Sequence, residues 1–180
     1  RLSTHLGNGS HALLPRHENY FLEQLADDRL SASFIADGHH LPDGLLRILI
    51  RVKGPGRLIA TCDASNLAGL PPGRHTAWGQ EFEILPEGKI VVPGTPFLAG
   101  SGAFTDRCLE TLLRLGELSL ADAFDVAGNR PRELFGLPAR LLEVGEPADL
   151  LAVHVGPPIR IVPLAPGGTN HPSPRRKMTA

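Results

Sequence analysis

The sequence predicts an α/β fold of the (β/α)-barrel type. Three strand-like apolar runs are followed in turn by His5, His40 and Asp63. Helical patterns separate these runs, so the order along the chain is strand, helix, strand, helix, strand, which favours a parallel sheet with crossover helices. Active sites of (β/α) barrels lie at the carboxyl ends of the strands. The sequence therefore predicts that these side chains gather at one edge of the sheet.

The first half of the chain supplies the elements of this pattern. An apolar face at helical spacing follows His17, and Pro42 suits the first turn of a second helix that Gly54 ends. We expect, in order, the end of a strand at 1–4, a helix at 17–29, a strand at 31–36, a helix at 42–53 and a strand at 57–62.

The second half departs from this alternation. Loose alternation broken by Pro86-Glu87-Gly88 predicts a hairpin insertion at about 74–93. The stretch 94–102 is rich in glycine and small residues and is expected to be a loop. Ser119 is typical of a helix N-cap. We further expect a helix at 105–115, a helical turn at 131–136, two strands at 148–153 and 159–162, and disorder from Pro166 onward.

Composition excludes several classes of protein. The 180 residues carry a formal net charge of −1, so no basic field attracts nucleic acid or a membrane surface. No apolar run approaches the roughly 20 residues that span a bilayer. The two cysteines, Cys62 and Cys108, fit a reducing compartment, and we expect a cytoplasmic protein. Because the chain begins at Arg1 and reaches His5 almost at once, we expect an N-terminal truncation.

Several polar residues have side chains suited to chemistry. An imidazole at a strand end, His5, is a good Zn²⁺ ligand, although a loop-bonded histidine is the simpler interpretation. Asn8 and the backbone at Gly9 can donate hydrogen bonds to a substrate, and Arg16 can bind phosphate or remain a solvated charge. Burying Asp63 is costly unless it is paired, bound to metal or used as a proton carrier; the alternative is a helix N-cap.

Two further positions are candidates for binding. His39 and His40 are adjacent, so on an extended backbone at most one of them faces a pocket. Ser101 lies in the glycine-rich stretch that we expect to be a loop, where backbone N–H groups can touch a ligand. No P-loop motif is present.

Taken together, these segments resemble the N-acetylglucosamine-6-phosphate deacetylases of the amidohydrolase superfamily. The family motifs are T-H-x-x-N-A, A-D-G-x-H, T-D-A and L-x-G-S, followed by a late N-P-A-x-x-x-G-L and an A-D-L strand. Their counterparts here are Thr4–Gly9, Ala36–His40, Thr61–Ala64 with Cys62 inserted, Leu98–Ser101, Asn129–Leu137 and Ala148–Leu150.

The resemblance implies the C-terminal half of a metal-dependent (β/α)8 TIM-type barrel. Residues 1–140 would form this partial amidohydrolase barrel, with the hairpin insertion at about 74–93. Residues 141–163 would be the closing strands of a small β-sandwich, and 164–180 a disordered tail.

The same resemblance implies a reaction. The enzyme would deacetylate N-acetylglucosamine 6-phosphate to glucosamine 6-phosphate and acetate, with Asp63 as the general base and then the acid. His5 would hold a divalent metal, zinc first and iron or another ion otherwise. The sugar and its phosphate would be held by Asn8, Gly9, Arg16, His40 and Ser101. A homodimer is also implied.

Two departures from the family pattern leave alternatives open. The family's other metal ligands, a Glu and a His, come from earlier strands, so we expect this chain to be inactive alone. Pro15–Asn19 stands where the family has a Gly-Arg-x-Pro-Gly loop. The alternatives are a hydrolase of another amide or cyclic amide, and a non-catalytic sugar-binding or assembly remnant.

Overall fold

The computed structural model describes residues 1–145, 150–156 and 159–165. It contains two compact units, Arg1–Ala139 and Arg140–Ala180. Among the described residues, none of the helices has both the length and the apolar character that crossing a membrane requires.

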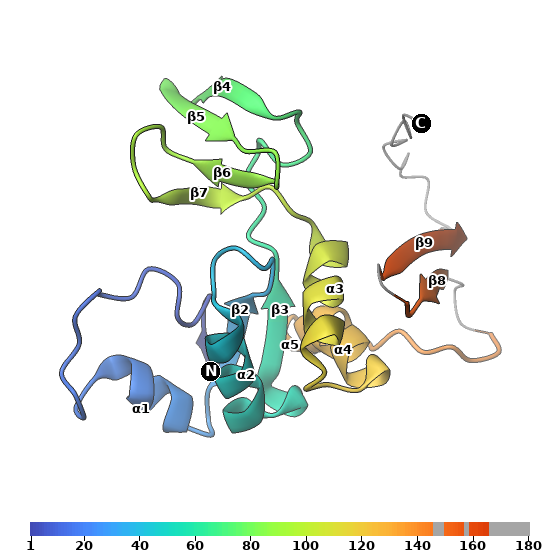
Figure 1. The fold of residues 1–180 in the computed structure, drawn as a ribbon. Helices are drawn as coiled ribbons and strands as arrows, with labels where there is room; N and C mark the ends of the chain where they lie inside the picture. The colour runs from blue at the N-terminus through green and yellow to red at the C-terminus, as the bar shows by residue number, and fades with distance from the viewer. Residues whose placement is uncertain (146–149, 157–158, 166–180) are drawn as a thin grey trace. The chain divides into compact units, whose positions relative to one another are not determined.

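The first unit is built on a three-stranded parallel sheet. Its strands are β1 (Leu2–Ser3), β2 (Ser31–Ile35) and β3 (Leu58–Thr61), in the order β1-β2-β3. The predicted α/β fold is confirmed, and the three strands alternate with helices in the predicted order (Figure 1). Within the described residues the sheet is not closed into a barrel, because β1 and β3 are its edge strands.

Five α-helices and one short 3-10 helix belong to this unit. Both α3 and α4 contact β3, and α5 contacts it as well. These helices therefore pack on the edge strand β3 of the parallel sheet. The elements are α1 (Tyr20–Ala26), α2 (Asp43–Lys53), η1 (Pro55–Arg57), α3 (Thr105–Leu115), α4 (Leu120–Ala127) and α5 (Asn129–Leu134). Fully buried side chains include Phe34, Ile35, Leu46, Leu49, Leu58, Leu112 and Val126.

Helix ends follow the capping residues. The helix predicted at 105–115 is confirmed, and the Ser119 hydroxyl accepts a hydrogen bond from the backbone N–H of Asp122 as an N-cap. The first helix is shorter than the predicted 17–29. It begins only at Tyr20 because the side chain of Asn19 caps it, accepting from the N–H of Leu22.

An antiparallel sheet of four strands is inserted after β3. Its strands are β4 (Gly73–Ala77), β5 (Gln80–Ile84), β6 (Lys89–Val91) and β7 (Leu98–Ser101). They enclose a small core of their own, with Leu67, Phe82, Ile84 and Ile90. The hairpin expected at 74–93 is therefore part of a larger sheet. The expectation of a loop was wrong at 98–101, because β7 pairs with β6 through a register shift that accommodates its small residues.

Among its described residues, the second unit contains an antiparallel hairpin. Its strands are β8 (Leu150–His154) and β9 (Arg160–Ala165), near the two strands expected at 148–153 and 159–162. Residues 148 and 149 lie outside the described residues, as does the part of the expected tail from 166 onward. Disorder was wrongly expected at 164–165, which form the end of β9. Membership of a β-sandwich remains a prediction.

Candidate active site

His5 and Asp63 lie at the same edge of the parallel sheet. His5 follows β1 and Asp63 follows β3, and in a parallel sheet both carboxyl ends point the same way. Both side chains line one cavity of about 330 Å³, together with residues of β2 and of α5 such as Ser33 and Leu134. The two residues that the sequence marks for chemistry therefore share an open cavity.

Both residues also have a backbone conformation that most residue types avoid. The φ angle is 33° at His5 and 53° at Asp63, and within the described residues only Trp78 joins them among non-glycine residues with positive φ. Asp and His tolerate this left-handed region better than other residues, but at an energetic cost. Such conformations concentrate at functional sites, where the surrounding structure imposes them.

The turn at His5 is held by β2. The backbone N–H of His5 donates to the Ser33 hydroxyl at 2.8 Å, and the N–H of Leu6 donates to the Ser33 carbonyl, also at 2.8 Å. The N–H of Asn8 then closes the turn on the carbonyl of His5 at 2.8 Å. These bonds determine the direction in which the chain leaves β1 and leave the imidazole exposed.

The turn at Asp63 is held by β3 and β7. Its backbone N–H donates to Thr61 Oγ1 at 3.3 Å, and its carbonyl accepts from the N–H of Ser101 at 2.8 Å. The Ser101 carbonyl accepts in turn from the N–H of Ser65 at 2.9 Å. Within the described residues the carboxylate of Asp63 makes no hydrogen bond or ion pair, so it is available to a ligand.

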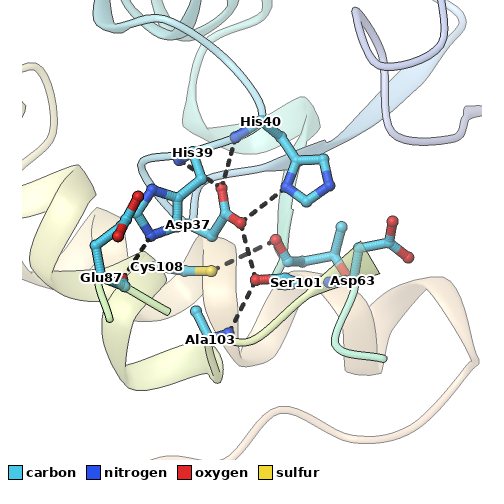
Figure 2. Close-up of polar contacts among 9 residues, drawn as sticks. Asp37, His39, His40, Asp63, Glu87, Ser101, Ala103 and Cys108 are labelled. Atoms are coloured by element: carbon cyan, nitrogen blue, oxygen red, sulfur yellow. Dashed lines mark hydrogen bonds and ion pairs between the residues drawn. The ribbon is translucent and has the colours of Figure 1, made fainter. Parts of the chain in front are cut away.

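A buried carboxylate, Asp37, organises the end of β2. Its Oδ1 accepts from the backbone N–H groups of His39 and His40 at 2.9 and 3.0 Å. Its Oδ2 accepts from Nδ1 of His40 and from the hydroxyl of Ser101, each at 2.8 Å (Figure 2). Burial acts to raise the pKa of Asp37, but the hydrogen bonds from His40, His39 and Ser101 outweigh it and hold the pKa below its ordinary value.

Comparison with known proteins identifies the relatives of this arrangement. No protein-family model matches the chain. An N-acetylglucosamine-6-phosphate deacetylase of Danio rerio is 34% identical over 161 residues, which are 83% of this chain and 38% of the relative. An N-acetylgalactosamine-6-phosphate deacetylase of Escherichia coli O157:H7 is 29% identical, over 84% of this chain and 40% of the relative.

The same assignment follows from three-dimensional structure. The structure of an N-acetyl-D-glucosamine-6-phosphate deacetylase from Mycobacterium smegmatis, solved in complex with N-acetyl-D-glucosamine-6-phosphate, superposes with a TM-score of 0.71 at 27% identity. The match covers 83% of this chain and 40% of that one. The chain belongs to the N-acetylglucosamine/N-acetylgalactosamine-6-phosphate deacetylase family. It spans about two fifths of the length of these deacetylases.

The remaining residues implied by the resemblance to deacetylases do not line the cavity. Asn8, Gly9 and Arg16 belong to the loop between β1 and α1, whereas His40 and Ser101 belong to the Asp37 network. Arg16 is exposed. Ser101 is only 1% exposed, and its hydroxyl donates to Asp37 while it accepts from the N–H of Ala103 at 3.0 Å.

The loop that carries Arg16 is joined by hydrogen bonds to the start of α1. Asn19 Nδ2 donates to the carbonyl of Pro15 at 3.0 Å. The hydroxyl of Tyr20 accepts from the backbone N–H of His11 at 3.0 Å and lies 3.0 Å from its Nδ1. These contacts give the loop a defined shape, although its sequence departs from the deacetylase pattern.

The metal that the deacetylase resemblance implies needs more donors than these residues give. In the part of the chain that the structure describes, no group of three or more His, Cys, Asp or Glu side chains is arranged to hold an ion. A catalytic zinc ion normally takes three protein ligands. His5 and Asp63 alone therefore do not complete a zinc site.

Sequence reasoning did not single out three residues of this site. Ser33 and Thr61 hold the turns at His5 and Asp63, and Asp37 holds His40. Ser33 carried a signal, since it is a polar residue between the apolar Ala32 and Phe34 of β2. Asp37 belongs to a motif that was recognised, but its partner Ser101 is 64 residues away, and no local pattern indicates that contact.

Proposed function

We propose that this chain forms the carboxyl-terminal part of an active site that hydrolyses the amide of an N-acetylated amino-sugar phosphate. N-acetylglucosamine 6-phosphate is the preferred candidate substrate, and its products would be glucosamine 6-phosphate and acetate. The observation that carries the proposal is the shared cavity of His5 and Asp63 in a member of this deacetylase family.

Asp63 is the residue proposed to move protons. Amide hydrolysis needs a base that takes a proton from water and an acid that delivers one to the departing amine, and one carboxylate can do both in turn. The unpaired, exposed carboxylate of Asp63 at the cavity supports this role.

The sugar phosphate is proposed to lie across the neighbouring loops. Arg16 supplies a guanidinium that pairs with phosphate, and Asn8 and the backbone of Gly9 supply further donors. His40 is proposed to bind the sugar. Ser101, whose hydroxyl is buried between Asp37 and Ala103, is better suited to holding Asp37 in place than to touching the sugar.

We propose further that the three-stranded sheet is a section of a (β/α)8 barrel, that the active protein is a homodimer, and that it is cytoplasmic. The parallel order of β1, β2 and β3 supports the first of these, and two free cysteines support the last. A divalent ion, with zinc preferred, belongs to this proposal only with ligands additional to those described here. Held by His5 together with such additional ligands, the ion would supply polarisation of the amide carbonyl and a lowered pKa of water.

Acetate release tests the proposal. The chain is assayed with N-acetylglucosamine 6-phosphate and Zn²⁺, alone and co-expressed with the amino-terminal part of the Danio rerio relative that it does not match. We expect no acetate from the chain alone and acetate from the pair. Removing the proton carrier by Asp63→Asn should lower the rate of the pair by about 10²–10⁴-fold.

The controls separate the alternatives. Asp28→Asn, an exposed carboxylate on the loop before β2, should leave the rate unchanged. A pair that binds the sugar phosphate without releasing acetate would support the sugar-binding remnant. Acetate release that Asp63→Asn does not slow would contradict the role of Asp63.

A further inference from the structure

Asp37 is a fully buried charge for which the proposed reaction has no use. We propose, on the basis of the proposed function, that Asp37 is a positioning residue that fixes the tautomer of His40. Nε2 of the neutral imidazole then accepts a hydrogen bond from an O–H or N–H group of the bound sugar.

The two oxygens of Asp37 have separate partners. Oδ1 accepts from the backbone N–H groups of His39 and His40, and Oδ2 accepts from the ring of His40 and the hydroxyl of Ser101. An ionised carboxylate has no proton to donate, so a hydrogen bond of 2.8 Å to Nδ1 requires that Nδ1 carry the proton. The geometry leaves one tautomer for a neutral ring.

The same hydrogen bonds keep Asp37 ionised. They hold its pKa below the ordinary value despite burial, so Oδ2 remains an acceptor at neutral pH. Ser101 contributes twice, because its hydroxyl bonds Asp37 while its backbone N–H holds the carbonyl of Asp63 at 2.8 Å. Ser101 therefore contacts Asp37, which bonds the proposed sugar-binding His40, and also the backbone of the proposed catalytic Asp63.

This assignment defines what His40 can recognise. Its side chain is 4% exposed, and within the described residues its Nε2 has no hydrogen-bond partner. An acceptor without a partner on a largely buried ring favours a ligand that supplies a donor. For the neutral ring, a sugar hydroxyl or the amide N–H of an N-acetyl group meets this need, whereas a phosphate dianion or a carbonyl oxygen does not.

The tautomer can be read directly in the full chain by long-range ¹⁵N–¹H correlation of the imidazole rings at alkaline pH, where imidazoles are neutral. We expect Nδ1 of His40 to be protonated and Nε2 to be bare. In Asp37→Asn, the amide oxygen is expected to keep the two backbone N–H groups, so that its NH₂ group faces Nδ1. The proton should then move to Nε2. A purely structural role of Asp37 would not require this change of tautomer.

Ser101→Ala is the matched control, because it removes a bond to the same oxygen but keeps the carboxylate, so the tautomer should stay unchanged. A proton on Nε2 in the wild-type chain would overturn the inference even if the variant failed to fold. An unchanged tautomer in folded Asp37→Asn would overturn it too.

Binding of N-acetylglucosamine 6-phosphate distinguishes this inference from the proposed function. The wild-type chain should show a change at Nε2 on titration, and Asp37→Asn should bind about tenfold more weakly, the effect of one lost hydrogen bond. If the chain has the predicted tautomer but does not bind the sugar phosphate even when paired with the amino-terminal part of the Danio rerio relative, the positioning role is supported and the proposed function is contradicted. Equal affinity of both chains would contradict recognition by Nε2.

Discussion

At the scale of single residues, the hydrogen bonds to Asp37 contribute most to the free energy of unfolding while its carboxyl group is ionised. Because its pKa is lowered in the folded chain, this contribution is present above the ordinary aspartate value of 3.8 and is lost as the pH falls toward the folded value. We expect Asp37→Asn to be less stable than the wild-type chain at neutral pH by about 1–3 kcal/mol, because hydrogen bonds to a charged group are replaced.

Urea unfolding across the acid range measures this difference. The gap between the two chains should narrow as the pH falls below 3.8, because there the unfolded wild-type chain takes up a proton at Asp37 that the folded chain takes up only at lower pH. A gap that stays constant down to the acid limit would mean that Asp37 is not held ionised by His40 and Ser101.

The residues of the site differ in how far the sequence could predict them. His5 and Asp63 were predictable because polar residues at strand ends share one edge of a parallel sheet. Their positive φ angles were not, since these depend on hydrogen bonds that Ser33 accepts and that the backbone N–H of Ser101 donates. Ser101 was expected to touch substrate, but its buried contact with Asp37 forms only when β7 packs beside the end of β3.

At the scale of elements, β7 links the inserted sheet to the site. Gly100 has φ of 77°, and a Cβ atom there would lie 2.9 Å from Cβ of Ser65 and 3.3 Å from the carbonyl oxygen of Asp63. We expect Gly100→Ala to destabilise the chain by roughly 1–3 kcal/mol through overpacking, in addition to the strain of its φ, and to shift the backbone NMR signals of Asp63.

Gly94→Ala is the control for Gly100→Ala. Gly94 has φ of 76° but no atom within 4 Å of the Cβ position, so its substitution introduces the same strain without the clash. Both variants are compared by urea unfolding. Equal losses of stability would show that the close approach of β7 to the Asp63 turn contributes nothing.

Helices and strands were predicted best where a strong period of apolar residues coincided with clear capping or chain-breaking residues at the ends. The helix at 105–115 has both, whereas α1 loses three residues at its start because Asn19 caps it. The strand β7 was missed since Leu98-Ala99-Gly100-Ser101 lacks β-branched residues, and its pairing with β6 is a tertiary contact with a register shift.

At the scale of the whole molecule, the chain matches part of the length of the deacetylases, and its described residues hold an incomplete set of metal donors. It spans 38% of the length of the Danio rerio relative, and β1 and β3 are both edge strands in the described sheet. The resemblance in sequence extends over most of this chain, so the family and the α/β fold were predictable. Closure of a barrel was not testable, because a parallel sheet of three strands is compatible with open and closed arrangements.

The proposed function depends most on the cavity between His5 and Asp63 as the place where the sugar amide lies. NMR titration of the full chain with N-acetylglucosamine 6-phosphate tests it, with inorganic phosphate as the control ligand. The sugar phosphate should produce its largest signal changes at His5, Thr61 and Asp63, whereas inorganic phosphate should affect only the loop of Asn8 and Arg16. Changes that leave His5 and Asp63 unaffected, or that concentrate in the β4–β7 sheet, would contradict the account.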